Sequence, residues 1–197
     1  MSVVERNTTA RQSAATKMWS INVRQVVYMA LGTALYAAIS IVFNIIPLPN
    51  AAGGAVALRP GIVIPVFFGV LFGPWVGLFV GGVGNVLGDL IYYHNFYWNW
   101  DVGNALIGFV SGLVMLFTFG RYRTTRAIVI AEIAGVVAII VGMAFAAYND
   151  IWVSKIDVGA AGSEFVAAAG SDLINALILL PIFLIAYNAA TARRGRA

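Results

Sequence analysis

Long apolar stretches dominate this sequence and restrict what the chain can fold into. Most of them run for about 20 residues, which is the length of helix that crosses the hydrocarbon core of a bilayer. The strands of an outer-membrane barrel would instead show about ten residues of alternating character. Only 10% of the residues are charged, against roughly 25% in soluble domains. The sequence therefore predicts an all-α integral membrane protein.

The apolar stretches are predicted to form a compact bundle of six transmembrane helices. We expect the spans at residues 21–46, 60–72, 75–93, 101–119, 127–148 and 164–189. Prolines and glycines lie between several of these spans, and Gly73 followed by Pro74 is a tight-turn signal. Residues 149–163 are expected to form a longer, partly polar loop. The membrane domain then covers residues 21–189, with a polar tail at 1–20 and a basic tail at 190–197.

The distribution of basic residues predicts the topology. With both termini in the cytoplasm, the outer segments contain only Arg59 and Lys155. The inner segments contain the other ten of the twelve basic residues: Arg6, Arg11, Lys17, Arg24, Arg121, Arg123, Arg126, Arg193, Arg194 and Arg196. Cytoplasmic loops of membrane proteins are enriched in lysine and arginine, so this asymmetry favours an even number of spans. We expect a multi-pass protein of a prokaryotic cell membrane, and the basic residues are not a signal for nucleic acid.

The stretch from Asn85 to Asn104 concentrates polar and aromatic side chains in an otherwise apolar chain. Asn85, Asp89 and Tyr92 are spaced i, i+4 and i+7, so a helix would place them on one face. Asp101 and Asn104 begin a second polar face on the next span. The two faces converge at one turn, which we interpret as the rim and wall of a small-molecule site.

Polar residues elsewhere fall in the same outer half of the predicted bundle. Asp172 and Asn175 lie about 12 to 17 Å below the start of their span, from a rise of about 1.5 Å per residue. A carboxylate at that depth usually faces a cavity or a partner. The predicted substrate-binding residues are Arg59, Asn85, Asp89, Tyr92, Asn95, Trp98, Asn99, Trp100, Asn104, Tyr148, Trp152, Asp172 and Asn175.

Some of these residues have two interpretations. Trp98 and Trp100 could stack on a flat heterocycle or could belong to an interfacial aromatic belt. Asp172 and Asp89 could bind a ligand or pair with Arg59. Asparagine, aspartate and aromatic rings suit riboflavin, thiamine or its pyrimidine, pyridoxine-type vitamers and nucleobases alike.

Several classes of function are disfavoured by what the sequence lacks. It has no cysteine, hence no disulfide or thiolate metal site, and its single histidine, His94, has no companion ligands. No phosphate-binding loop is present, so ATP dependence would have to come from partners. An intramembrane enzyme using Asp89, His94 and Asp101 lacks an activated nucleophile. We expect no catalytic residue, no cofactor and no metal.

Small residues recur at helical spacing in two places. Gly69, Gly73, Gly77 and Gly81 repeat every four residues, and such faces let helices approach closely in lipid. We expect these glycines to pack within the protein. A second stripe, made of Ala30, Ala34 and Ala38 in the first span, lies away from the polar residues and suits docking against another membrane protein.

Three features carry a resemblance to a known family: the alanine stripe, the sequence RPGIVIPVFFGVLFGPWVGLFVGGVGNVLGDL and the sequence WNWDVGNALIGFVSGL. In these features the chain resembles the substrate-binding S components of energy-coupling factor (ECF) transporters. Within that family it looks most like the riboflavin-transporter-like group. The resemblance covers roughly residues 21–188. It implies a non-catalytic subunit that captures a vitamin or related micronutrient from outside. It also implies docking of Ala30, Ala34 and Ala38 on a transmembrane coupling subunit, with ATP hydrolysed by two cytoplasmic ATPases.

One alternative from another functional class is a stand-alone secondary transporter coupled to protons through Asp89, Asp172 or Glu132. Such carriers often show inverted repeats and helices broken at mid-membrane. The sequence has no internal repeat that we can detect, and uptake by the isolated protein would distinguish this alternative.

Overall fold

The computed structural model describes residues 16, 18–50, 53 and 56–194, and their regular structure is helical. The elements, in chain order, are α2 (Val23–Phe43), η1 (Pro60–Ile62), α3 (Val63–Phe72), α4 (Pro74–Tyr92), α5 (Trp98–Gly112), α6 (Met115–Thr118), α7 (Thr125–Val153) and α8 (Val158–Arg194). Five segments are long and apolar enough to cross a membrane, and Pro60–Phe72 is a shorter apolar helix. The prediction of an all-α membrane protein is confirmed.

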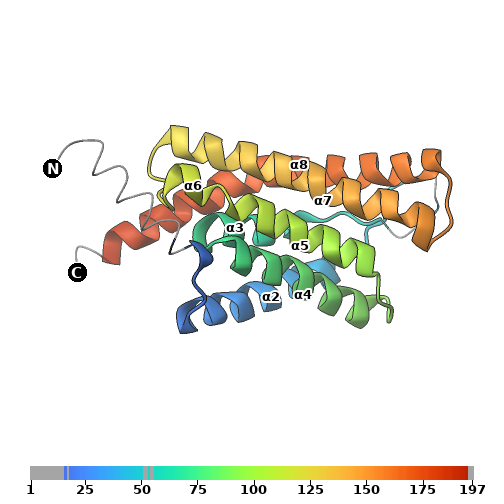
Figure 1. The fold of residues 1–197 in the computed structure, drawn as a ribbon, viewed down its shortest axis with the longest axis horizontal. Helices are drawn as coiled ribbons and strands as arrows, with labels where there is room; N and C mark the ends of the chain where they lie inside the picture. The colour runs from blue at the N-terminus through green and yellow to red at the C-terminus, as the bar shows by residue number, and fades with distance from the viewer. Residues whose placement is uncertain (1–15, 17, 51–52, 54–55, 195–197) are drawn as a thin grey trace.

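The helices form an elongated bundle with two distinct ends (Figure 1). The start of α2, the short helix α6 and the end of α8 lie together at one end, while the α4–α5 loop and the α7–α8 turn lie at the other. We call the end with the start of α2 the basic end, because it contains Arg24 in the first turn of α2. Arg121 and Arg123 in the α6–α7 connection and Arg126 in the first turn of α7 lie there as well.

Glycines bring α4 and α5 into backbone contact, as the sequence predicted. A Cβ added at Gly77 would overlap the backbone oxygen of Gly108, and one added at Gly81 would overlap the backbone oxygen of Asn104. On the other side of α4, a Cβ at Gly84 would come within 2.7 Å of the Tyr36 ring. The three helices α2, α4 and α5 are therefore fixed against one another at the level of Asn104 and Tyr36.

The basic end is closed by packed side chains. Met18 is buried, and the Trp19 ring meets Trp75 edge-on with ring centroids 5.8 Å apart. The Tyr122 hydroxyl donates to the backbone oxygen of Val70 at 2.7 Å and accepts from the Thr118 hydroxyl at 2.9 Å. Burial raises the pKa of Tyr122 above its ordinary value, so this phenol stays protonated and keeps its donor.

The predicted loop at residues 149–163 is wrong. α7 continues to Val153 and α8 starts at Val158, which leaves only a short turn. Asn149 bonds the Phe145 backbone oxygen one turn back, so a polar side chain continues the helix where the apolar run has ended. Asp157 accepts from the backbone N–H groups of Gly159 and Ala160 and thereby caps α8. Polarity alone did not distinguish the polar end of a helix from a loop.

Two other boundaries differ from prediction. α5 starts at Trp98, three residues before the predicted span, and its span bends at Leu113 and Val114 before α6. α8 continues to Arg194, into the segment predicted as a basic tail. Most of the predicted N-terminal tail (residues 1–15 and 17) and the last three residues of the C-terminal tail lie outside the described residues.

Candidate functional site: a polar cavity at one end of the bundle

A cavity of about 220 Å³ opens near the end of the bundle opposite the basic end. Helices α2, α4, α5, α7 and α8 all contribute to its wall, together with the segment before η1 and the α4–α5 loop. We call it the polar cavity. Its lining residues are Ser40, Asn44, Val56, Ala57, Arg59, Asn85, Asp89, Tyr93, Tyr97, Trp100, Asp150, Ser154 and Glu164.

One wall of the polar cavity is built around the amide of Asn85. Its Nδ2 donates at 2.9 Å both to Asp89 Oδ2 and to Asp101 Oδ1. The helical spacing of Asn85 and Asp89 on α4, predicted from the sequence, brings the first pair together. Just beyond α4, burial and the Asp89 carboxylate raise the pKa of Tyr93 to about 12, so its phenol remains protonated at neutral pH.

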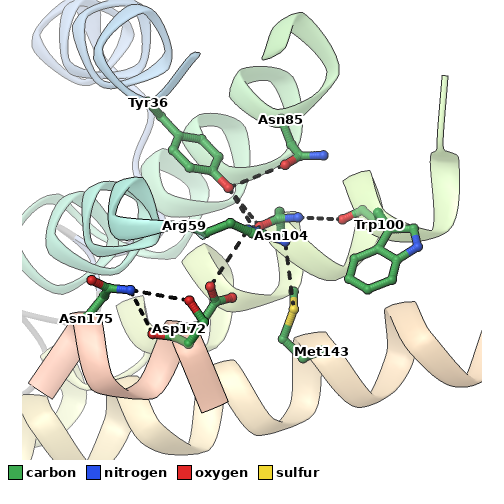
Figure 2. Close-up of polar contacts among 9 residues, drawn as sticks. Tyr36, Arg59, Asn85, Trp100, Asn104, Met143, Asp172 and Asn175 are labelled. Atoms are coloured by element: carbon green, nitrogen blue, oxygen red, sulfur yellow. Dashed lines mark hydrogen bonds and ion pairs between the residues drawn. The ribbon is translucent and has the colours of Figure 1, made fainter. Parts of the chain in front are cut away.

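Behind the cavity, residues from three helices and from the segment before η1 meet in a buried network centred on Asn104 (Figure 2). Asn104 Oδ1 accepts from the Tyr36 hydroxyl at 2.9 Å and from the Arg59 guanidinium. Arg59 also donates to the Tyr36 hydroxyl at 3.1 Å, and its Nε lies 3.7 Å from Asp172 Oδ1. Asn104 and Asp172 are fully buried. The network ties α2, α5 and α8 to the residue that precedes η1.

The charge of Arg59 is maintained by its neighbours. Burial by itself would lower its pKa, but Asp172 and the Tyr36 hydroxyl raise it by more, and the net pKa lies above the ordinary value. Arg59 is therefore a fixed cation whose charge is directed at Asp172. The contact between Arg59 and Asp172 is the sole ion pair within the part of the chain that the structure describes.

The opposite wall consists of groups from α5, α7 and α8. Trp100 Nε1 donates to Asp150 Oδ2 at 2.6 Å, and the Ser154 hydroxyl donates to Asp150 Oδ1 at 2.7 Å. Glu164 lines the cavity next to them, and its Oε2 is buried without a hydrogen-bond partner among the described residues. This wall offers acceptors to a ligand.

The structure divides the predicted site residues into three groups. Arg59, Asn85, Asp89 and Trp100 line the polar cavity. Asn99, Asn104 and Asp172 are buried behind it, and Asn99 bonds the Ala146 backbone oxygen. The remaining predicted residues do not line the cavity: Tyr92, Asn95, Trp98, Tyr148, Trp152 and Asn175.

The residues in the third group have other surroundings. Asn95 is exposed and accepts from the backbone N–H of Phe96. Tyr148 packs on Phe165, with ring centroids 6.1 Å apart. Trp152 is 73% exposed and Trp98 is 43% exposed. For Trp98, this exposure is compatible with the interfacial interpretation, which stays a prediction.

Sequence reasoning did not include several lining residues. Ser40 on α2 and Asn44 just beyond its end line the cavity. With the buried Tyr36 they are spaced four apart and form a polar stripe on an apolar helix. That periodicity was available in the sequence. The pairing of Asp150 with Trp100 was not, because it depends on how α5 and α7 pack.

The arrangement suits binding of a small molecule. Acceptors and donors from several helices converge on a partly open cavity with aromatic faces at Tyr93, Tyr97 and Trp100, which is the usual make-up of a ligand pocket. Within the described residues, no group of three or more His, Cys, Asp or Glu side chains is arranged to hold a metal ion.

Comparison with known proteins identifies the family. The ECF-type riboflavin transporter S component family matches residues 20–189. The chain belongs to this family. ECF S components are membrane subunits of transporters and are not enzymes, so the polar cavity is a candidate for the substrate site rather than for an active site.

Three curated relatives similar to this chain are UPF0397 proteins. A UPF0397 protein of Streptococcus gordonii is 27% identical over 180 residues, covering 89% of this chain and 94% of the relative. A UPF0397 protein of Onion yellows phytoplasma is 36% identical over 92 residues, 47% of each chain. The UPF0397 protein PA0141 of Phytoplasma australiense is 39% identical over 92 residues, covering 47% of this chain and 45% of the relative.

Proposed function

We propose that the protein captures a vitamin or related small micronutrient from the outside of a prokaryotic cell and passes it to an ATP-driven ECF importer. The observation that carries this proposal is the polar cavity, built by several helices at one end of an apolar bundle in a chain of the S-component family. In this proposal the cavity faces outward and the packed basic end faces the cytoplasm.

The proposed topology has six crossings and both termini in the cytoplasm. The start of α2 and the end of α8 lie at the same end of the bundle, which supports an even number of crossings (Figure 1). Arg24, Arg121, Arg123 and Arg126 at that end support its cytoplasmic placement by the positive-inside rule. The membrane domain would cover residues 21–189, between short cytoplasmic segments at 1–20 and 190–197.

We place partner docking on the outer face of α2. Ala30, Ala34 and Ala38 are all exposed there. Large apolar neighbours on this helix are exposed as well, including Leu31 at 60% and Leu35 at 44%. Small residues between larger apolar ones allow a second helix to approach closely in lipid. This face supports contact with a transmembrane coupling subunit, whose two ATPase partners would supply the energy.

The experiment that separates binding from coupling is the substitution Ala34→Trp. A bulky ring on the exposed face of α2 should keep the coupling subunit at a distance without touching the polar cavity. We expect ligand binding by the isolated protein within about twofold of wild type, and loss of ATP-dependent uptake in cells that also produce the coupling subunit and the ATPases.

Ala186→Trp is the matched control, because Ala186 is an equally small, exposed residue on α8. It should leave both binding and uptake intact. Normal uptake by the Ala34→Trp protein would contradict docking through α2. Sustained uptake by the wild-type protein alone in liposomes would contradict the subunit assignment and favour a stand-alone carrier.

A further inference from the structure

The polar cavity has an excess of acidic groups. Asp89, Asp150 and Glu164 line it, and Arg59 is its only basic lining residue. The Arg59 charge is engaged by Asp172, whose carboxylate is fully buried and has no other polar contact among the described residues. None of the remaining three acids forms an ion pair on the described part of the chain, although Asp89 lies within the field of Arg59.

The three acids differ in how many hydrogen bonds their carboxyl oxygens accept. Asp150 accepts from Trp100 and Ser154, and Asp89 accepts from Asn85. Glu164 is only 6% exposed, and its carboxyl group interacts with that of Asp150. Its Oε2 has no hydrogen-bond partner within the described residues. An unpaired buried carboxylate oxygen is costly, which makes it an informative exception in a wall that is otherwise well bonded. This oxygen belongs to a residue that lines the cavity.

Aromatic faces accompany the acids. Tyr93, Tyr97 and Trp100 line the same cavity, and the face of a Trp or Tyr ring attracts a cation through its quadrupole. Carboxylates beside aromatic faces are the combination that recognises an organic cation, because charge and ring contact act together.

We propose that the ligand of the polar cavity is a compact organic cation with N–H donors, held by Glu164, Asp150 and Asp89 against the neighbouring aromatic rings. This proposal rests on the proposed function, since it names the substrate class for the same cavity. The cavity volume of about 220 Å³ lies below the range of roughly 300–1,000 Å³ for pockets of drug-sized ligands. It therefore favours a molecule with one or two rings over one with three fused rings.

Isothermal titration calorimetry of the full chain in detergent tests the charge requirement. The cationic probes are thiamine, benzamidine and tyramine. The uncharged probes are riboflavin, pyridoxine and benzamide, and nicotinate is the anion. Benzamidine and benzamide have nearly the same shape and differ in charge, so they isolate the effect of the positive charge. We expect the tightest binder to be a cation and benzamide to bind at least tenfold more weakly than benzamidine.

The variant Glu164→Gln tests the assigned group. It retains shape and removes the negative charge, and charged hydrogen bonds are worth enough that cation affinity should fall by about tenfold to a hundredfold. Affinity for the uncharged probes should remain within about twofold. Glu132→Gln is the control, because Glu132 is a partly buried acid on a different helix, α7, and does not line the polar cavity. Thermal unfolding of both variants verifies that they fold.

The outcomes separate this inference from the proposed function. If an uncharged compound or nicotinate binds most tightly, or if Glu164→Gln binds the best cation as well as wild type does, the inference is wrong and capture of a small molecule stands. If no cation binds but an uncharged probe does, the inference is likewise wrong and the capture function stands. If none of the seven probes binds, both the inference and the capture function are contradicted.

Discussion

The substitution Asn104→Ala tests whether the buried network holds the helices in place. Asn104 is fully buried, and its Oδ1 accepts from Tyr36 and from the charged Arg59. A lost hydrogen bond to a charged group is worth about 1.5–3 kcal/mol, and a neutral one in a membrane protein about 0.6 kcal/mol. We therefore expect Asn104→Ala to lower the free energy of unfolding by about 2–4 kcal/mol, measured by SDS denaturation in mixed micelles.

Asn175→Ala is the control for this measurement. Asn175 is on α8, and its amide donates to the backbone oxygen and the hydroxyl of Ser171 on the same helix. Its loss removes no hydrogen bond between helices in the described part of the chain, so the expected change is below about 1 kcal/mol. If Asn104→Ala destabilises the protein no more than Asn175→Ala does, the network does not hold α2, α5 and α8 together.

Two further predictions concern the packing around the site. Gly81→Ala should lower the free energy of unfolding by about 1–3 kcal/mol, because its Cβ would overlap the backbone oxygen of Asn104. Gly170→Ala, where a Cβ meets nothing within 4 Å, should be neutral or stabilising, and equal effects would refute the close-packing argument. Arg59→Met should cost about 3–5 kcal/mol by leaving Asp172 unpaired, whereas Arg59→Met combined with Asp172→Leu should recover part of that loss. An additive double variant in the same denaturation assay would contradict a direct pair.

The helices could largely be predicted from the sequence. The lengths of the apolar runs, and the prolines and glycines between them, located the ends of α2, α3 and α4 to within about three residues. The spacing of Gly77 and Gly81 predicted close packing, and the structure shows it against α5. The extent of α7 and α8 was missed. Their facing ends carry polar residues such as Asn149 and Asp157, where hydropathy no longer distinguishes helix from loop.

The site could be predicted only in part. Helical periodicity placed Asn85 and Asp89 on one face, and depth placed Asp172 and Arg59 in the same outer half of the bundle, where the structure pairs them. Periodicity does not define how a helix is rotated against its neighbours. It therefore could not show that Trp100 faces the cavity whereas Trp98, two residues away, lies 43% exposed. Nor could it join Asp150 to Trp100, a contact across 50 residues of chain.

Tryptophan fluorescence of the isolated protein, titrated with a panel of vitamins and nucleobases, is the most direct test of the central claim that this subunit binds a small molecule in the polar cavity. Trp100 lines the cavity, and Trp152 is 73% exposed away from it. We expect saturable quenching by at least one compound, retained in Trp152→Phe and reduced in Trp100→Phe. No saturable response to any compound, or an unchanged response in Trp100→Phe, would contradict the claim.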